Sequence, residues 1–107
     1  MRRLEIPPTE LAGRGIGEII RTVALHLARE GDRLVEIYLP PDDYSHAEQM
    51  AFCGLTNDWR YDANGMALRI LGTWVLIKLR TEPGRAATAI SRSFKHETVD
   101  TYEVELS

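Results

Sequence analysis

Apolar residues recur every three or four positions between Ile16 and Leu27, which is the spacing of one face of an α-helix. The members of this stripe are Ile16, Ile19, Ile20, Val23 and Leu27. Charged residues lie off the stripe, so the helix has one apolar and one polar side. Glycine readily adopts the positive φ with which many helices end. The pattern therefore predicts a helix that follows the glycines at 13, 15 and 17 and is stopped by Gly31.

The segment from Met66 to Arg80 is apolar on both sides of an extended chain. If Gly72 divides this segment, the side chains of its second piece alternate between two faces. One face carries Val75, Ile77 and Leu79, and the other carries Trp74, Leu76, Lys78 and Arg80. A strand with apolar residues on both faces lies in the middle of a sheet, under helices or against another chain. We expect this strand to organise the fold and to provide an interface.

Shorter alternating segments predict further strands, at residues 2–6, 34–39, 59–62 and 101–106. Asn64 and Gly65 both tolerate the positive φ of a type I′ turn, so a hairpin should join the strand at 59–62 to one that begins at Met66. Gly72 should form a bulge or a second tight turn.

Two more helices are expected. Ser45 and Glu48 have the spacing of a capping box, which predicts a short helix from Ser45 to about Gly54. Its buried contacts should be Met50, Ala51 and Phe52. A third helix should begin at Pro83 and Gly84, because Ala86, Ile90 and Phe94 follow at steps of four.

The order of these elements predicts an α+β fold in a single domain that spans residues 1–107. We expect a mostly antiparallel sheet of four to five strands with two to three helices packed on it. A βαββαβ arrangement with an inserted helix is one topology that fits.

Composition places the chain among ordinary globular proteins, because 44% of its 107 residues are hydrophobic and 27% are charged. The single cysteine, Cys53, excludes an internal disulfide framework and a cysteine-based metal cage, so a cytoplasmic location is expected. The first residues, MRRLEIPP, lack the apolar stretch of a signal peptide. No apolar run is long enough to span a membrane, so no membrane partner is expected.

Charge is divided unevenly along the chain. Seven acidic residues and one arginine lie from Glu30 to Asp58, whereas seven basic and two acidic residues lie from Arg60 to Lys95. The net charge of −3 argues against a general nucleic-acid binder. Nearly all cations of the second region are arginines, which bind carboxylates and phosphates with two parallel hydrogen bonds. This favours an interaction surface.

Motifs with recognisable chemistry are weak. The glycines from Gly13 to Gly17 precede a helix, as in phosphate-binding loops, but Glu18 follows where such a loop needs a glycine. His46 lies near Asp42 and Asp43, without the spacing of helical metal ligands. Cys53 lies in an apolar stretch and should be a small buried hydrophobe. We expect no catalytic residues, no cofactor and no metal site.

The leading hypothesis is therefore a small, cytosolic, non-enzymatic interaction module, either an adaptor or an inhibitor, with a nucleic-acid-processing complex as one conceivable target. Its interface should comprise Trp74, Leu76, Lys78, Arg80 and Arg69, either for a protein partner or for a homodimer. One alternative is a small enzyme or ligand-binding domain that uses His46 or His26 with Asp42 or Asp43. Another is direct nucleic-acid binding, through Arg69, Lys78, Arg80, Arg85 and Arg92.

Overall fold

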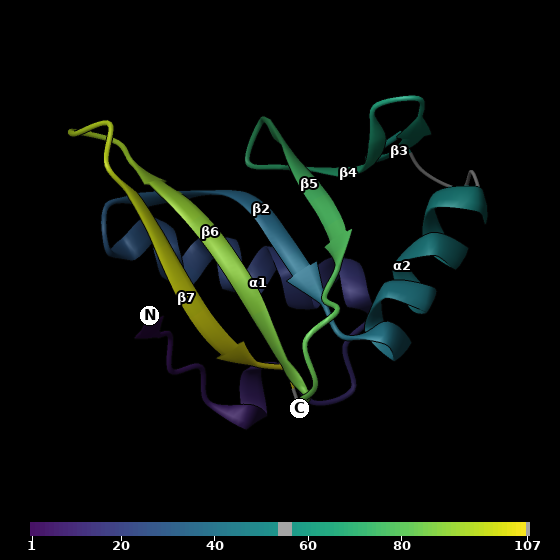
Figure 1. Ribbon diagram of the computed structural model, residues 1–107, viewed down its shortest axis with the longest axis horizontal. Coiled ribbons are helices and arrows are strands. Elements are labelled where there is room, and N and C mark those ends of the chain that lie inside the picture. The colour runs from purple at the N-terminus through teal and green to yellow at the C-terminus, as the bar shows by residue number, and fades with distance from the viewer. Residues whose placement is uncertain (54–56, 107) are drawn as a thin grey trace.

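The computed structural model describes residues 1–53 and 57–106. Its elements follow the chain as β1 (Arg2–Arg3), a 3-10 turn η1 (Pro8–Glu10), α1 (Ile16–Arg29), β2 (Asp32–Leu39), α2 (Pro41–Cys53), β3 (Trp59–Asp62), β4 (Gly65–Ile70), β5 (Thr73–Leu79), β6 (Ala86–Ser93) and β7 (Val99–Glu105). The strands form one sheet of seven, in the order β1-β7-β6-β2-β5-β4-β3 (Figure 1).

The sheet is mixed rather than mostly antiparallel. Strand β2 runs parallel to β5, and β1 runs parallel to β7, while the other neighbours are antiparallel. The α+β class is correct, but the expected antiparallel sheet of four to five strands is wrong. The connection from β2 through α2 and the β3–β4 hairpin returns the chain beside β2 in the same direction. Alternation within a strand carries no information about the direction of its neighbour, so the sequence did not reveal this crossover.

The third helix is a strand. Residues Ala86–Ser93 form β6, which pairs with β2 on one side and β7 on the other. A step of four residues is also an even step, so Ala86 and Ile90 share a strand face as well as a helix face. Ala87 and Ala89 face the core and are fully buried. Two apolar faces and two long strand partners decide the conformation of this segment.

Helix α1 is confirmed and ends where Gly31 predicts, but it begins before the third glycine, so Gly17 lies inside it. It begins at Ile16, and its apolar stripe is buried against the sheet. Gly31 has a φ of 84°, and its backbone N–H donates to the carbonyl of Ala28 at 3.0 Å. The left-handed conformation at the residue after the helix is the feature that glycine permits most easily.

Helix α2 begins one turn earlier than the capping box predicts. The N–H of Tyr44 donates to the carbonyl of Pro40 at 2.8 Å, which makes Pro41 the first helical residue. Proline is favoured there because the position needs no N–H donor. Ser45 therefore lies inside the helix and caps nothing. Of the expected contacts, Ala51 packs against the core and is partly buried, whereas Met50 and Phe52 are exposed. The fully buried residue of this helix is Ala47.

Both predicted tight turns form hairpins, with one correction. Strands β4 and β5 are joined by Leu71 and Gly72, which have φ values of 51° and 81°, as a type I′ turn requires. Strands β3 and β4 pair as expected, but the type I′ assignment to Asn64 and Gly65 is wrong, because only Gly65 has a positive φ. The Asp62 side chain instead accepts a hydrogen bond from the N–H of Asn64 at 2.8 Å.

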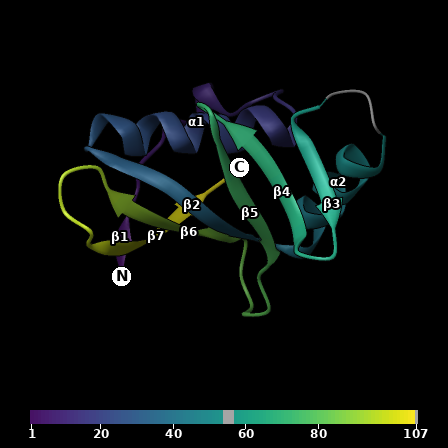
Figure 2. The ribbon, with the colours of Figure 1, turned by 90° about the horizontal axis from the view of Figure 1, so that it is seen from above.

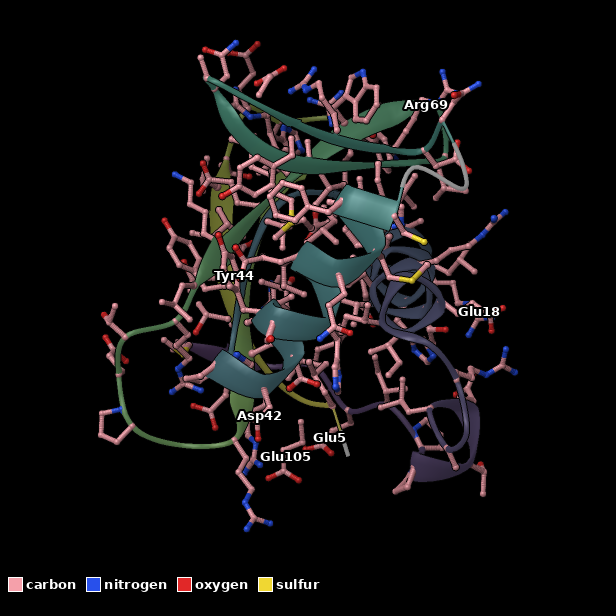
Figure 3. All side chains as sticks on the ribbon, turned by 90° about the vertical axis from the view of Figure 1, so that its right-hand side faces the viewer. Glu5, Glu18, Asp42, Tyr44, Arg69 and Glu105 are labelled. Atoms are coloured by element: carbon pink, nitrogen blue, oxygen red, sulfur yellow. The ribbon has the colours of Figure 1, made fainter. Side chains whose placement is uncertain are left out.

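Helices α1 and α2 lie on the same face of the sheet, which curves around them (Figures 2 and 3). A single core joins Ile20, Val23 and Leu27 of α1 and Ala47 of α2 to inward residues of the strands. Those strand residues include Leu34, Ile37, Leu68, Val75, Ile77 and Val104. Neither helix covers the opposite face of the sheet, and that face is the natural place to look for function.

Candidate interaction face

The sheet face that points away from α1 and α2 is here named the open face. Strand register assigns to it Arg60 on β3, Ala67 and Arg69 on β4, Trp74, Leu76 and Lys78 on β5, Arg33, Glu36 and Tyr38 on β2, Thr88, Ile90 and Arg92 on β6, and Thr101 and Glu103 on β7. Alternation along each strand places these residues opposite the core residues. Arg69 can be followed in Figure 3, where it extends outward from the edge of the curved sheet.

Trp74 contacts two arginines, one on β3 and one on β4. The Arg60 guanidinium carbon is 4.6 Å from the centre of the Trp74 ring, and that of Arg69 is 5.8 Å away. Arg69 is also the direct cross-strand partner of Trp74. Cations over an indole face are attracted by its π electrons, which restricts the rotamers of all three side chains. The indole nevertheless stays 39% exposed, so it forms a fixed apolar projection on the surface.

The cations around Trp74 have carboxylate neighbours. Arg60 Nε lies 3.2 Å from Asp62 Oδ2 without hydrogen-bond geometry, and an Arg69 nitrogen lies 3.4 Å from Asp58 Oδ1. Lys78 Nζ is 3.7 Å from Glu36 Oε1 on the neighbouring strand. These ion pairs are partly exposed and contribute little to stability. Their main effect is to cancel much of the positive field of this half of the face.

The middle of the open face is less polar than its margins. Leu76 on β5 and Ile90 on β6 flank Glu36 on β2, and both are only half-buried. The Tyr38 hydroxyl donates to the Glu36 carboxylate at 3.3 Å, and the Lys78 ammonium lies 5.8 Å from the Tyr38 ring centre. Glu36 is thus engaged by Tyr38 on its own strand and by Lys78 on β5, and its direct cross-strand neighbours are the aliphatic Leu76 and Ile90.

Four of the five residues chosen from the sequence meet on this face, namely Arg69, Trp74, Leu76 and Lys78. Arg80 does not join them, because β5 ends at Leu79. The Arg80 side chain is only 12% exposed, donates to the carbonyl of Ala86 and lies 3.9 Å from Glu82. It therefore holds the 80–86 loop in shape.

Arg60, Tyr38 and Ile90 belong to the open face and were not chosen from the sequence. Arg60 could have been found from the predicted hairpin. Its register partner is Ala67, which is adjacent in sequence to the core residue Leu68 and therefore points to the other face of the sheet. Ile90 could not have been found while its segment was interpreted as a helix. Tyr38 required knowledge that β2 is the parallel neighbour of β5.

The histidines are placed by separate contacts. His26 on α1 lies 3.2 Å from a carboxylate oxygen of Glu10 in η1. His46 is exposed on α2, near Asp43. Burial raises the pKa of the Asp43 carboxyl, His46 opposes that rise, and Asp42 adds to it. Among the residues that the structure describes, no contact joins His26 to His46 or to these aspartates.

The remaining sequence candidates also receive positions. Gly15 caps α1 without a side-chain hydrogen bond, and Arg14 pairs with Glu18 at 3.4 Å beside it. Cys53 is exposed, so the expectation that it is buried is wrong. Within residues 1–53 and 57–106, no three His, Cys, Asp or Glu side chains gather closely enough to hold a metal ion. No helix in the same residues is long and apolar enough to cross a membrane.

Comparison of the chain with protein-family models, with curated proteins and with solved structures finds no match. The open face is therefore interpreted from its own geometry and charge.

Proposed function

We propose that this protein is a non-enzymatic interaction module that binds a protein partner through the open face. The observation that carries the proposal is Trp74, which is in cation–π contact with Arg60 and Arg69 on a sheet face that neither helix covers. Tryptophan and arginine are the residue types that most often dominate the binding energy of protein interfaces.

Pre-organisation supports this interpretation. Association costs free energy when exposed side chains must be immobilised in the complex. The contacts with Arg60 and Arg69 already restrict the Trp74 indole in the free protein. The half-buried Leu76 adds apolar area on the same strand as Trp74, and the half-buried Ile90 lies two strands away on the same face, beyond Glu36. A partner would need an apolar pocket for the indole, with acceptors for the flanking guanidinium groups at its rim.

A protein partner fits the charges better than a nucleic acid does. Affinity for a phosphate backbone depends on cations that can neutralise phosphates. Arg33 and Arg92 on the open face form no ion pair with a described residue. The cations around Trp74, however, namely Arg60, Arg69 and Lys78, already have carboxylates within 3.2 to 3.7 Å. These pairs would have to be broken or would repel a polyanion, whereas mixed charges around an apolar centre match the usual anatomy of a protein interface.

Single-stranded nucleic acid remains the second candidate, for one specific reason. Trp74 and Tyr38 share the open face with Arg69, Lys78 and Arg92. Aromatic rings that stack bases, next to cations that follow the backbone, are the usual elements of single-strand binding surfaces. This alternative predicts affinity that falls steeply as salt concentration rises.

The module would act by occupying its partner's surface, as an adaptor or as an inhibitor, with a nucleic-acid-processing complex as one type of target. We place its action in the cytosol, because the exposed free thiol of Cys53 is best preserved in a reducing compartment.

The test compares affinity capture from host lysate by the wild-type protein, by Trp74→Ala and by Leu25→Ala, with and without nuclease. Leu25 on α1 is a matched control, because it is apolar and 40% exposed but lies on the helical side. We expect a stoichiometric protein that survives nuclease, is retained by Leu25→Ala and is lost with Trp74→Ala. Direct binding of that protein should then be measured with the purified components.

A different interface, a homodimer and a nucleic-acid ligand would each give a different result in these experiments. If the partner remains bound to Trp74→Ala but is lost with Leu25→Ala, the interface lies on the helical side and the proposal is wrong. A wild-type dimer in solution that Trp74→Ala converts to a monomer would assign the open face to a second copy of this chain. A gel shift of single-stranded oligonucleotides at low salt, lost with Trp74→Ala, would favour the nucleic-acid alternative.

A further inference from the structure

A second feature lies on the other side of the sheet, between the C-terminal half of α1 and the first residues of β2 and β5. It is a cleft of about 130 Å³. Its lining residues are Ala24, Ala28, Asp32, Arg33, Leu34, Ile70, Leu71, Thr73, Val75 and Phe94. A cavity of about 150 Å³ accommodates one benzene-sized molecule, so this cleft has room for one aromatic ring or a short aliphatic chain.

Asp32 is the unusual member of this otherwise largely apolar lining. It is 8% exposed, and its Oδ2 accepts hydrogen bonds from the Tyr102 hydroxyl at 2.9 Å and from Ser91 at 3.4 Å. Both donors come from β6 and β7, on one side of β2, whereas β5 and the cleft lie on the other side. Its Oδ1 accepts no hydrogen bond from any described residue.

The Asp32 carboxylate also lacks a charged partner. No lysine, arginine or histidine of the described chain forms an ion pair with it, although buried carboxylates usually require one. Arg2 reaches only as far as the Tyr102 hydroxyl, to which it donates at 3.1 Å. Arg33 lines the cleft, but alternation along β2 points its exposed side chain to the opposite side of the sheet from Asp32.

The mouth of the cleft carries two large apolar side chains in water. Leu71 is 56% exposed and Phe94 is 63% exposed. Leu71 adopts a φ of 51°, which is unfavourable for a residue with a β-carbon and is the only such value among the non-glycine residues that the structure describes. The backbone of Phe94 is held beside the end of α1, because its N–H donates to the carbonyl of Gly31. An apolar ligand would cover both side chains.

From these contacts we infer that the cleft is a binding site for a primary ammonium group on an apolar stem. The stem would lie against Ala24, Ala28 and Val75, and the ammonium would donate to Asp32 Oδ1. This supplies the positive charge that the buried carboxylate lacks and removes Leu71 and Phe94 from water. The inference does not depend on the open face, because the cleft is lined by Ala24 and Ala28 of α1 and therefore lies on the helical side of the sheet.

The test is a titration of ¹⁵N-labelled protein with 2-phenylethylamine and with 2-phenylethanol, followed by NMR. We expect saturable shifts at the amides of Ala24, Ala28, Leu71 and Phe94, with affinity for the amine at least about tenfold higher than for the alcohol. Equal affinities, shifts confined to other regions, or no saturation with the amine would each overturn the inference.

Two variants locate the interaction. Asp32→Asn should lose the preference for the amine, whereas Asp100→Asn should keep it, because Asp100 joins the same network through Arg2 at 3.3 Å without lining the cleft. If Asp32→Asn fails to fold, Leu71→Asn gives an independent result. Asparagine tolerates the left-handed φ and removes the apolar rim, so amine affinity should fall while the protein remains folded. Unchanged affinity in Leu71→Asn would exclude the cleft mouth from the site.

A primary ammonium group on an apolar stem can belong to a free amine or to the lysine side chain of a partner protein. Butylamine and N-acetyl-lysine methylamide carry the same four-carbon stem, so a comparison of their affinities distinguishes the two sources. Comparable affinities would identify a lysine side chain as an acceptable ligand, whereas exclusion of the lysine derivative would assign the cleft to free amines. Failure of both to compete with 2-phenylethylamine would overturn the inference.

Discussion

The hydroxyl of Tyr102 on β7 donates to the carboxylate of Asp32 on β2 across the intervening strand β6, at 2.9 Å. Ser91 on β6 donates to the same oxygen, and Arg2 on β1 donates to the Tyr102 hydroxyl. One side chain from each of four neighbouring strands therefore takes part in a single polar network. Because Tyr102 and Ser91 are almost completely buried, their polar atoms depend on these partners rather than on water.

Removal of the Tyr102 hydroxyl should destabilise the protein. Tyr102→Phe keeps the ring but leaves Asp32 without its shorter hydrogen bond, and an unsatisfied buried group costs about 1–3 kcal/mol. Tyr38→Phe is the matched control, because the Tyr38 hydroxyl donates to Glu36 on the open face and is less buried. Urea denaturation should show a clearly lower free energy of unfolding only for Tyr102→Phe. Equal losses in both variants would contradict the importance of the buried network.

The same tyrosine predicts a loss of stability in alkali. Burial raises the pKa of the Tyr102 hydroxyl, and the hydrogen bond to Asp32 adds to this effect. As pH rises above the ordinary tyrosine pKa of about 10, the unfolded chain releases this proton before the folded protein does. The folded state then binds more protons, so the free energy of unfolding falls with increasing pH. Denaturation between pH 9 and 11 should show this decline, and Tyr102→Phe should reduce its slope.

Replacement of Leu71 should stabilise the β4–β5 hairpin. A left-handed conformation costs a non-glycine residue about 1–2 kcal/mol. Leu71→Asn creates Asn-Gly, the preferred dipeptide of a type I′ turn, and should raise the free energy of unfolding by about 1 kcal/mol. Gly72→Ala should do the opposite, because Gly72 has a φ of 81°. Thermal denaturation of Leu71→Asn and Gly72→Ala would test these two expected changes in stability. If Leu71→Asn is less stable than the wild type, the contacts of the leucine side chain outweigh its backbone strain.

Arg60 and Trp74 should be energetically coupled. Their contact at 4.6 Å is partly exposed, and such cation–π pairs contribute about 0.5–1 kcal/mol. A double-mutant cycle with Arg60→Ala and Trp74→Phe would measure the coupling from urea denaturation. Arg60→Lys should restore little of it, because ammonium does not stack as guanidinium does. A coupling near zero would mean that the arginine does not hold the indole in the free protein.

The candidate interface illustrates what local pattern can and cannot reveal. Trp74, Leu76 and Lys78 were found together because alternation places them on one face of any strand. Whether that face is covered depends on where α1 and α2 pack, which strand alternation does not encode. Arg60 and Ile90 lie 14 and 16 residues away from Trp74 along the chain. Strand pairing, which local pattern does not encode, decides that they share a face with Trp74.

The sequence by itself determined the elements that depend on neighbouring residues. The apolar stripe of α1, its end at Gly31 and the positions of the hairpins near Gly65 and Gly72 follow from side-chain spacing and from glycines that adopt a positive φ. Only the tertiary structure decided that β2 and β5 run parallel, that residues 86–93 are extended and that Asp32 meets Tyr102. The physical reason is distance along the chain, since backbone hydrogen bonds between strands and the burial of both faces of β6 depend on partners that folding alone brings together.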